Sequence, residues 1–176
     1  MDTSVDTSLF TYRRINALGF LACSSALAFA ILYLEGELGL DPCPLCTLVR
    51  IIVLTMAAIF LIAFLHNPKQ GGQRFYGGLN FLLVGGGLAT TARHIWLQNL
   101  PADEVPACGP GLEYMMEMMP VFDVLHQILS GSGECADIQW TYLGLTLPEQ
   151  SMAFFVVMLV LVWKQLSKKN PRSYFN

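Results

Sequence analysis

The sequence predicts an all-α integral membrane protein, a bundle of four transmembrane helices with a long outer loop that carries a short amphipathic helix. Of its 176 residues, 54% are hydrophobic and 13% are charged, whereas a soluble domain carries about 25% charged residues. In addition, four apolar runs are long enough to cross a bilayer. The composition excludes intrinsic disorder, and a net charge of −3 argues against nucleic acid as a partner.

The apolar runs predict spans at about residues 15–34, 45–65, 75–92 and 145–165. At about 1.5 Å per residue, twenty helical residues match a hydrocarbon core of about 30 Å. The first run is uncharged between Arg14 and Glu35. The fourth is less regular, because it is followed by Lys164 and must either include Pro148 or let that lysine extend toward the headgroups.

The first span imitates a cleavable signal, because Arg13 and Arg14 precede an apolar run as in twin-arginine or secretory signal peptides. The run continues through Leu34, however, and three further spans follow. We therefore expect an uncleaved first helix and a single membrane domain over residues 1–176.

Basic residues gather before the first span, between the second and third spans, and after the fourth span. They are Arg13, Arg14, Lys69, Arg74, Lys164, Lys168, Lys169 and Arg172. Cytoplasmic loops are enriched in Lys and Arg, so this side is predicted to be cytoplasmic and to hold both termini. The outer loops, at about 35–44 and 95–146, are acidic, and the longer one contains neither Lys nor Arg.

The long outer loop contains an amphipathic pattern. Apolar residues recur at steps of three and four, at Leu112, Met115, Met119, Phe122, Leu125 and Leu129. This spacing predicts a helix that rests on the membrane surface and is bent at Pro120. A methionine-rich face can also bind protein partners, so that alternative stays open.

Four of the five cysteines lie on the predicted outer side, which is the oxidising side, so we expect them to form pairs. They are Cys43, Cys46, Cys108 and Cys135. The fifth, Cys23, lies near the middle of the first span. Because a thiol in hydrocarbon is poorly reactive, Cys23 is assigned a packing role.

The motif Cys43-Pro44-Leu45-Cys46 stands immediately before the second span. The first turn of a helix has unpaired N–H groups and a positive dipole end, which favour a thiolate and hence disulfide exchange. Haem attachment would require His where Thr47 stands. A zinc site would prefer a second close pair of cysteines, and the remaining two outer cysteines are 27 residues apart, so we expect no metal.

Two polar residues lie close to this motif. Arg50 follows Cys46 by one helical turn and lies about 6 Å into the apolar span. An ionisable residue at such a depth indicates function, here a fixed cation that stabilises the Cys46 thiolate and an anionic redox partner. The alternative is an arginine that extends to the headgroups. His94, at the outer end of the third span, could donate a proton to the same partner or be an ordinary interfacial histidine.

The remaining outer cysteines occur in turn-rich segments, Pro106–Pro110 and Ser130–Cys135. Exposed cysteines in such contexts suit a mobile disulfide. The alternative is a structural crosslink that closes the loop, worth about 4 kcal/mol at most. Because two separable pairs lie on one side of the membrane, a disulfide can pass from one to the other.

Taken together, the chain resembles the disulfide bond formation protein B family, DsbB, over nearly its whole length. The resemblance rests on four spans with inside termini, on the order and spacing of the four outer cysteines, on Arg50 and His94, and on a motif before the fourth span. That motif is Gln139-Trp140-Thr141-Tyr142-Leu143-Gly144-Leu145.

The resemblance implies a disulfide oxidase of the bacterial inner membrane. Reduced DsbA of the periplasm would attack a Cys108–Cys135 disulfide at the sulfur of Cys108, and Cys135 would then engage Cys43. Cys46 would pass the electrons to ubiquinone or menaquinone held near Arg50 and His94. Two rivals remain: an oxidase of the same fold that serves a specialised DsbA-like partner, and a structural membrane subunit with crosslinked loops.

Overall fold

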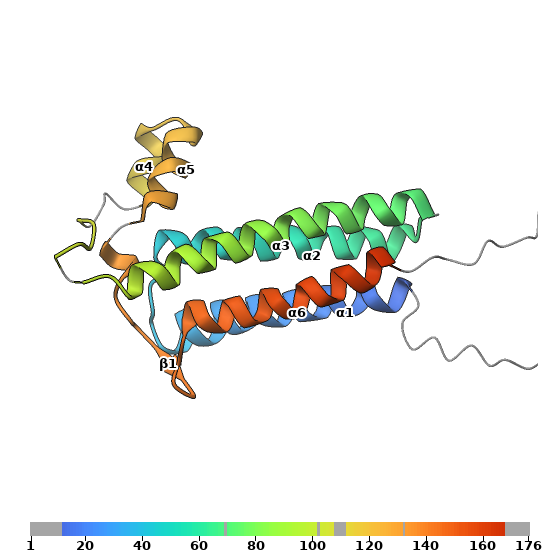
Figure 1. The fold of residues 1–176 in the computed structure, drawn as a ribbon, viewed down its shortest axis with the longest axis horizontal. Coiled ribbons are helices and arrows are strands. Elements are labelled where there is room, and N and C mark those ends of the chain that lie inside the picture. Colours follow the sequence, from blue (N-terminus) through green and yellow to red (C-terminus); the bar gives the residue numbers. More distant parts are fainter. Residues whose placement is uncertain (1–11, 69, 102, 108–111, 132, 168–176) are drawn as a thin grey trace, which may run out of the picture.

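Four long helical segments lie side by side in the described part of the computed structural model (Figure 1). It describes residues 12–68, 70–101, 103–107, 112–131 and 133–167. The first segment is α1 (Tyr12–Ala28), which continues without a break into a π-helix, η1 (Phe29–Glu37). The others are α2 (Pro44–His66), α3 (Gln70–Gln98) and α6 (Leu147–Ser167). The chain enters and leaves the bundle at the same end (Figure 1).

The predicted all-helical membrane character is confirmed. Within the described residues, three helical segments are long and apolar enough to cross a membrane, namely Tyr12–Glu37, α2 and α6. The 29-residue α3 is longer still. It is less apolar than these three because it contains glycines, threonines and Asn80 among its large hydrophobic residues.

The helices pack around one central apolar core. In this bundle α3 packs on α6, α1 packs on α2, and α2 packs on α3. The core is formed by Cys23, Val53, Met56, Ala57, Phe60, Val84, Phe155, Met158 and Val162. On the outside, large apolar side chains point away from the bundle in every long helix, including Leu82 of α3 with 74% of its surface exposed. Such an exposed apolar surface suits contact with lipid.

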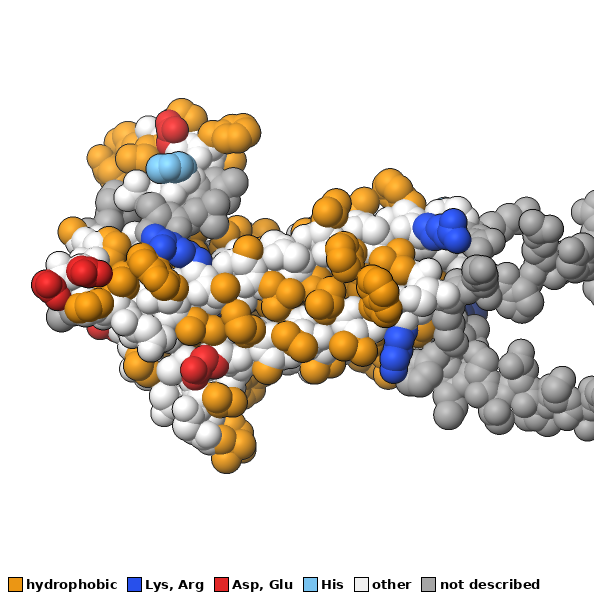
Figure 2. Space-filling model, viewed as in Figure 1, with side chains coloured by type: hydrophobic (Ala, Val, Ile, Leu, Met, Phe, Trp, Pro, Cys, Tyr) orange, Lys and Arg blue, Asp and Glu red, His pale blue; other side chains and the backbone are white. Residues whose placement is uncertain are grey.

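Charge is divided between the two ends of the bundle. In the view of Figure 2, hydrophobic side chains cover the middle of the helices. Most of the acidic side chains in view lie toward the loop end of the molecule, and basic side chains lie at the end where the chain termini leave. Arg50 of α2 and Arg93 of α3 are basic residues near the loop end. Arg50 pairs with Glu35, and the Arg93 guanidinium lies 4.1 Å from the centre of the Trp96 ring.

Helix ends differ in detail from the expected spans. The first helical segment runs to Glu37, three residues into the predicted outer loop, because the π-helical turns continue the helix. The third runs to Gln98, so that His94 lies within a helix rather than after it. Single-turn π-bulges are frequent at functional sites. The nine-residue η1 is longer than one such turn and lies beside the candidate site described below.

The long loop contains more structure than the one bent helix expected from its periodicity. Pro120 separates two helices, α4 (Leu112–Met118) and α5 (Val121–Ser130), because a proline has no N–H to continue the first. Within the predicted apolar face Met115 is buried, whereas Phe122 is exposed. The periodicity therefore predicted helix correctly but not the break.

The loop ends in a short turn and a hairpin. A 3₁₀ turn, η2 (Gly133–Cys135), is followed by β1 (Thr141–Tyr142) and β2 (Leu145–Thr146), paired antiparallel. Leu143 and Gly144 connect the strands with φ of 55° and 80°, as a two-residue hairpin turn requires. The Trp140 ring stacks on Tyr142 and also contacts Phe29 of η1, which fixes the hairpin against the first helical segment.

Close approach of α3 and α6 depends on two glycines of α3, Gly77 and Gly87. A Cβ at Gly77 would lie 2.6 Å from the Leu166 side chain of α6. A Cβ at Gly87 would lie 2.3 Å from the ring of Phe155 in α6, whereas a Cβ at Gly86 would meet no described atom within 4 Å. Small residues at one face of a membrane helix allow such contact. Gly86 and Gly87 are adjacent, but only Gly87 lies in the contact with α6.

We predict that Gly87→Ala destabilises the bundle by about 1–3 kcal/mol, because the added methyl group must displace the Phe155 ring. Gly86→Ala is the matched control, and it should be neutral or stabilising by up to about 1 kcal/mol. Unfolding of the purified protein in mixed micelles of increasing SDS content, followed by circular dichroism, measures both. Equal effects of the two substitutions would contradict the assignment.

Candidate redox site

Cys43 and Cys46 lie at the first turn of α2. Cys43 is the N-cap residue, with an extended backbone, and Pro44 occupies the first helical position, where a missing N–H costs nothing. The backbone N–H of Cys46 donates to the Cys43 Sγ at 3.4 Å, and Thr47 donates through both its N–H and its hydroxyl to the Cys43 carbonyl. The motif thus starts the helix and holds a sulfur over its positive end.

The two sulfurs are poised for disulfide formation. Both residues are thiols in this structure, and the Sγ of Cys43 donates to the Sγ of Cys46 at 3.2 Å. A disulfide has an S–S distance of about 2.05 Å, so the sulfurs need to approach by only about 1.2 Å. Cys43 is buried, whereas Cys46 is partly exposed.

His94 of α3 lies beside this pair. Its Nε2 is 3.9 Å from the Cys43 Sγ, and its ring also forms a hydrogen bond with the backbone of Cys135. The imidazole is buried. The sequence predicted that His94 lies near the redox partner of the dithiol. In the structure it lies next to the Cys43 thiol.

Cys135 is not the exposed loop residue expected from its glycine-rich context. It is 1% exposed and packs in a cluster with Cys43, Leu45 and Leu97. The loop can dock this closely because Gly131, with φ of +85°, approaches the Leu97 side chain. Turn-forming residues predicted a turn correctly, but they carry no information on which surface that turn covers.

The remaining two cysteines are Cys108 and Cys23. Cys108 lies outside the described residues, so its predicted pairing with Cys135 stays a prediction. Cys23 is fully buried in the core between the helices, as expected for a packing residue.

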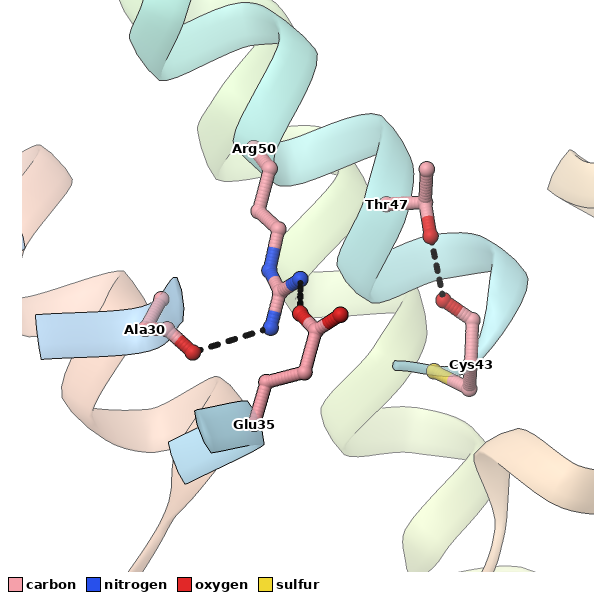
Figure 3. A network of polar contacts seen from close by, with 5 residues as sticks. All are labelled: Ala30, Glu35, Cys43, Thr47 and Arg50. Carbon is pink, nitrogen blue, oxygen red and sulfur yellow. Dashed lines mark hydrogen bonds and ion pairs between the residues drawn. The ribbon is translucent and has the colours of Figure 1, made fainter. Parts of the chain in front are cut away.

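Arg50 is held by the first helical segment (Figure 3). Its guanidinium pairs with the carboxylate of Glu35, and its Nη2 donates to the Ala30 carbonyl at 3.2 Å. Sequence reasoning missed Glu35, which was assigned to an outer loop. The sequence contains one indication of this pairing. Glu35 is the charge that ends the first apolar run, and it lies near the outer boundary of the membrane, as Arg50 does.

A cavity of about 260 Å³ lies between the long helices, next to the dithiol. Its polar lining includes Cys46, Arg50, Thr91, His94 and Gln139, and most of the remaining lining is apolar, with residues such as Leu27, Val49, Val53 and Phe155. An apolar cavity with a few convergent polar groups is the usual form of a small-molecule site.

Comparison with known proteins identifies the family of this chain. The model of the family "Disulfide bond formation protein DsbB" matches residues 12–165. The chain belongs to the DsbB family. The matched region runs from the start of α1 nearly to the end of α6 and includes every candidate site residue.

Relatives named disulfide bond formation protein B match over nearly the full length of both chains. The Psychrobacter sp. (strain PRwf-1) protein is 45% identical over 168 residues, covering 92% of this chain and 97% of the relative. The Marinobacter nauticus protein is 45% identical over 165 residues, covering 93% and 98%. The Acinetobacter baumannii protein is 45% identical over 162 residues, covering 92% and 94%.

DsbB membership and the membrane-length helices make this chain a membrane protein of disulfide bond formation. The family name implies thiol–disulfide oxidoreductase chemistry. A dithiol at a helix N-terminus, next to a histidine and a third cysteine, suits that chemistry.

Proposed function

We propose that this DsbB-family protein is a quinone-dependent disulfide oxidase of the bacterial inner membrane, which reoxidises a periplasmic DsbA-like protein. One observation carries the proposal: Cys46 lines the same apolar cavity as Arg50 and His94. A thiol, a fixed cation and an imidazole thus converge on a space within a membrane-length bundle. A lipid-soluble two-electron acceptor fits that setting.

In this proposal all four long helices cross the membrane, with both termini in the cytoplasm and the dithiol on the periplasmic side. The length of α3 and its exposed apolar side chains support the fourth span. The segregation of basic residues to the end of the bundle where the chain enters and leaves supports the orientation.

Arg50 and His94 would hold ubiquinone or menaquinone. The cavity fits such a ring, because it combines apolar walls with a guanidinium, an imidazole and the Gln139 amide. A bound quinone would accept two electrons and two protons. The guanidinium would stabilise negative charge on a quinone oxygen, and the imidazole would hold a proton for it.

The dithiol would supply those electrons. When the Cys43–Cys46 disulfide forms from two thiols, two electrons and two protons leave the pair. The Cys46 sulfur faces the cavity and would be the donor, and Cys43 would then close the S–S bond from 3.2 Å. His94, 3.9 Å from the Cys43 sulfur, could take the proton released there.

Exchange with the soluble partner would involve the loop cysteines. A thiolate of the reduced DsbA-like protein would attack the Cys108–Cys135 disulfide at Cys108 and release Cys135. The Cys135 sulfur would attack Cys43 of the oxidised pair and release Cys46. The burial of Cys135 in one cluster with Cys43 supports this second step.

The orientation can be tested by labelling. In a cysteine-free background, we expect Asp103→Cys to react with a membrane-impermeant maleimide in cells whose outer membrane has been permeabilised. We expect Lys168→Cys to react only after lysis, because it would lie in the cytoplasm. Mass-shift gels measure both, and protection of position 103 with labelling of position 168 would refute the orientation.

The relay can be tested by anaerobic mixing of the purified protein with reduced DsbA and a short-chain quinone analogue. We expect loss of quinone absorbance in step with DsbA oxidation. Cys46→Ser should abolish quinone reduction, because its electron donor is lost, while exchange with DsbA through the loop cysteines persists. Cys108→Ser should abolish that exchange, while a small dithiol still drives quinone reduction.

Cys23→Ala is the control and should behave as the wild type, because its thiol lies in the core away from the dithiol. Quinone reduction by the Cys46→Ser variant at the wild-type rate would exclude the assigned donor. Disulfides that stay fixed when quinone is withheld would favour a structural role for the cysteines.

The role of Arg50 gives a separate prediction. Charged hydrogen bonds are worth about 1.5–3 kcal/mol, so Arg50→Ala should raise the KM for quinone about ten- to a hundredfold, with DsbA exchange unchanged. Arg50→Lys should recover part of the loss. Arg93→Ala is a matched control, because Arg93 stacks on Trp96 rather than lining the cavity. An unchanged KM in Arg50→Ala would rule out the assigned role.

A further inference from the structure

A second, smaller cavity lies against the dithiol. It measures about 20 Å³ and is lined by Cys43, Cys46 and His94, with other residues of the loop end. A space of about 10–15 Å³ is enough for one water molecule, so this cavity has room for a single ion. It adjoins the larger, mostly apolar cavity and shares Cys46, His94, Gln139, Leu147 and Pro148 with it, whereas Cys43, Glu134 and Asp137 line only the smaller one.

The donor atoms around it are spaced as metal ligands are. The Cys43 and Cys46 sulfurs are 3.2 Å apart, the Cys43 sulfur and the His94 Nε2 are 3.9 Å apart, and all three atoms lie within 4.8 Å of one another. Bonds to tetrahedral zinc of about 2.3 Å for sulfur and about 2.0 Å for nitrogen would separate two sulfurs by about 3.8 Å and sulfur from nitrogen by about 3.5 Å. The Cys46 sulfur and the His94 Nε2 would have to approach each other by up to about 1.3 Å, and the two sulfurs would have to separate by about 0.6 Å; side-chain rotations can provide both movements.

The surroundings favour a cation. Glu134 and Asp137 line the same small cavity, and both are exposed at its loop side. Their carboxylates attract cations toward the three donors. The hydrogen bond between the His94 ring and the Cys135 backbone is the kind of contact that orients a ligating histidine.

In the sequence, the two loop cysteines are too far apart to form a second close pair of metal ligands. In the fold, however, α3 supplies a ligand from another helix, His94. Two thiolates and one imidazole form a soft donor set that suits zinc and related ions. With three protein ligands, a fourth position is left for water.

We propose that the reduced protein binds one thiophilic divalent cation, Zn²⁺ or a similar ion, through the sulfurs of Cys43 and Cys46 and the Nε2 of His94. Binding replaces two S–H bonds by two sulfur–metal bonds and releases two protons, and no electron moves. The ion therefore prevents the sulfurs from closing a disulfide and stops any oxidant that depends on this dithiol. The binding step itself does not depend on the proposed quinone chemistry.

Cobalt provides a direct test, because Co²⁺ bound tetrahedrally by thiolates has strong visible absorption. The protein is purified without a histidine tag, reduced, freed of reductant under anaerobic conditions and titrated with Co²⁺ in detergent. We expect one equivalent to give tetrahedral bands that Zn²⁺ then abolishes. Protein oxidised at Cys43–Cys46 should give none, since a disulfide is no longer a thiolate ligand.

Variants separate the three-ligand site from a bare dithiol. His94→Gln should weaken Co²⁺ binding at least about tenfold, and Cys43→Ser should abolish the thiolate bands. Cys23→Ala should bind as the wild type. Absence of the bands in reduced wild-type protein would overturn the proposal, as would undiminished affinity in His94→Gln.

An activity measurement distinguishes the two proposals. Added Zn²⁺ should halt oxidation of the dithiol, and EDTA should restore it. If quinone reduction proceeds normally but the reduced protein binds no Co²⁺, the metal site is refuted and the oxidase is retained. If Co²⁺ binds as expected but quinone is never reduced, the oxidase is refuted and the metal site stands.

Discussion

The first turn of α2 is the constraint on which the rest of the site depends. Cys43 caps this helix, accepts the N–H of Cys46 and lies beside His94, so a single residue fixes the helix start, the spacing of the dithiol and its contact with α3. Pro44 restricts the backbone at the first helical position, so residues of the motif itself determine this geometry. The rest of the bundle then supplies what the motif lacks, an imidazole and a third cysteine.

The docking of the loop end places Cys135 where the proposed relay needs it. A fully exposed Cys135 would reach Cys43 only by chance encounters of a mobile segment. Burial in one cluster with Cys43 and Leu97 instead holds the third sulfur beside the dithiol. In the proposed oxidase, exchange with a soluble partner then requires the other loop cysteine, because Cys135 is covered. Cys108 would thus react with the soluble partner, and Cys135 would react with the dithiol.

The sequence predicted what depends on local pattern. Apolar runs located the long helices within a few residues. The spacing of Cys43, Cys46 and Arg50 predicted a candidate site on one helix, and all three residues lie at the start of α2. Contacts between segments could not be predicted in this way. The pairing of Glu35 with Arg50 depends on the turn between two helices, and the burial of Cys135 depends on which surface the loop covers. The break at Pro120 was mistaken for a bend because periodicity continues across it.

The pairing of Arg50 with Glu35 bears on how the guanidinium can act on a neighbouring cavity. A lone charge near hydrocarbon is costly, and a carboxylate partner reduces that cost. The Glu35 side chain, however, is 45% exposed and that of Arg50 is 22% exposed. Water and salt therefore screen the carboxylate more than the guanidinium. Of the two, only Arg50 lines the larger cavity, whose lining also includes Asp41. The guanidinium is therefore the member of the ion pair that can stabilise an acceptor gaining negative charge there.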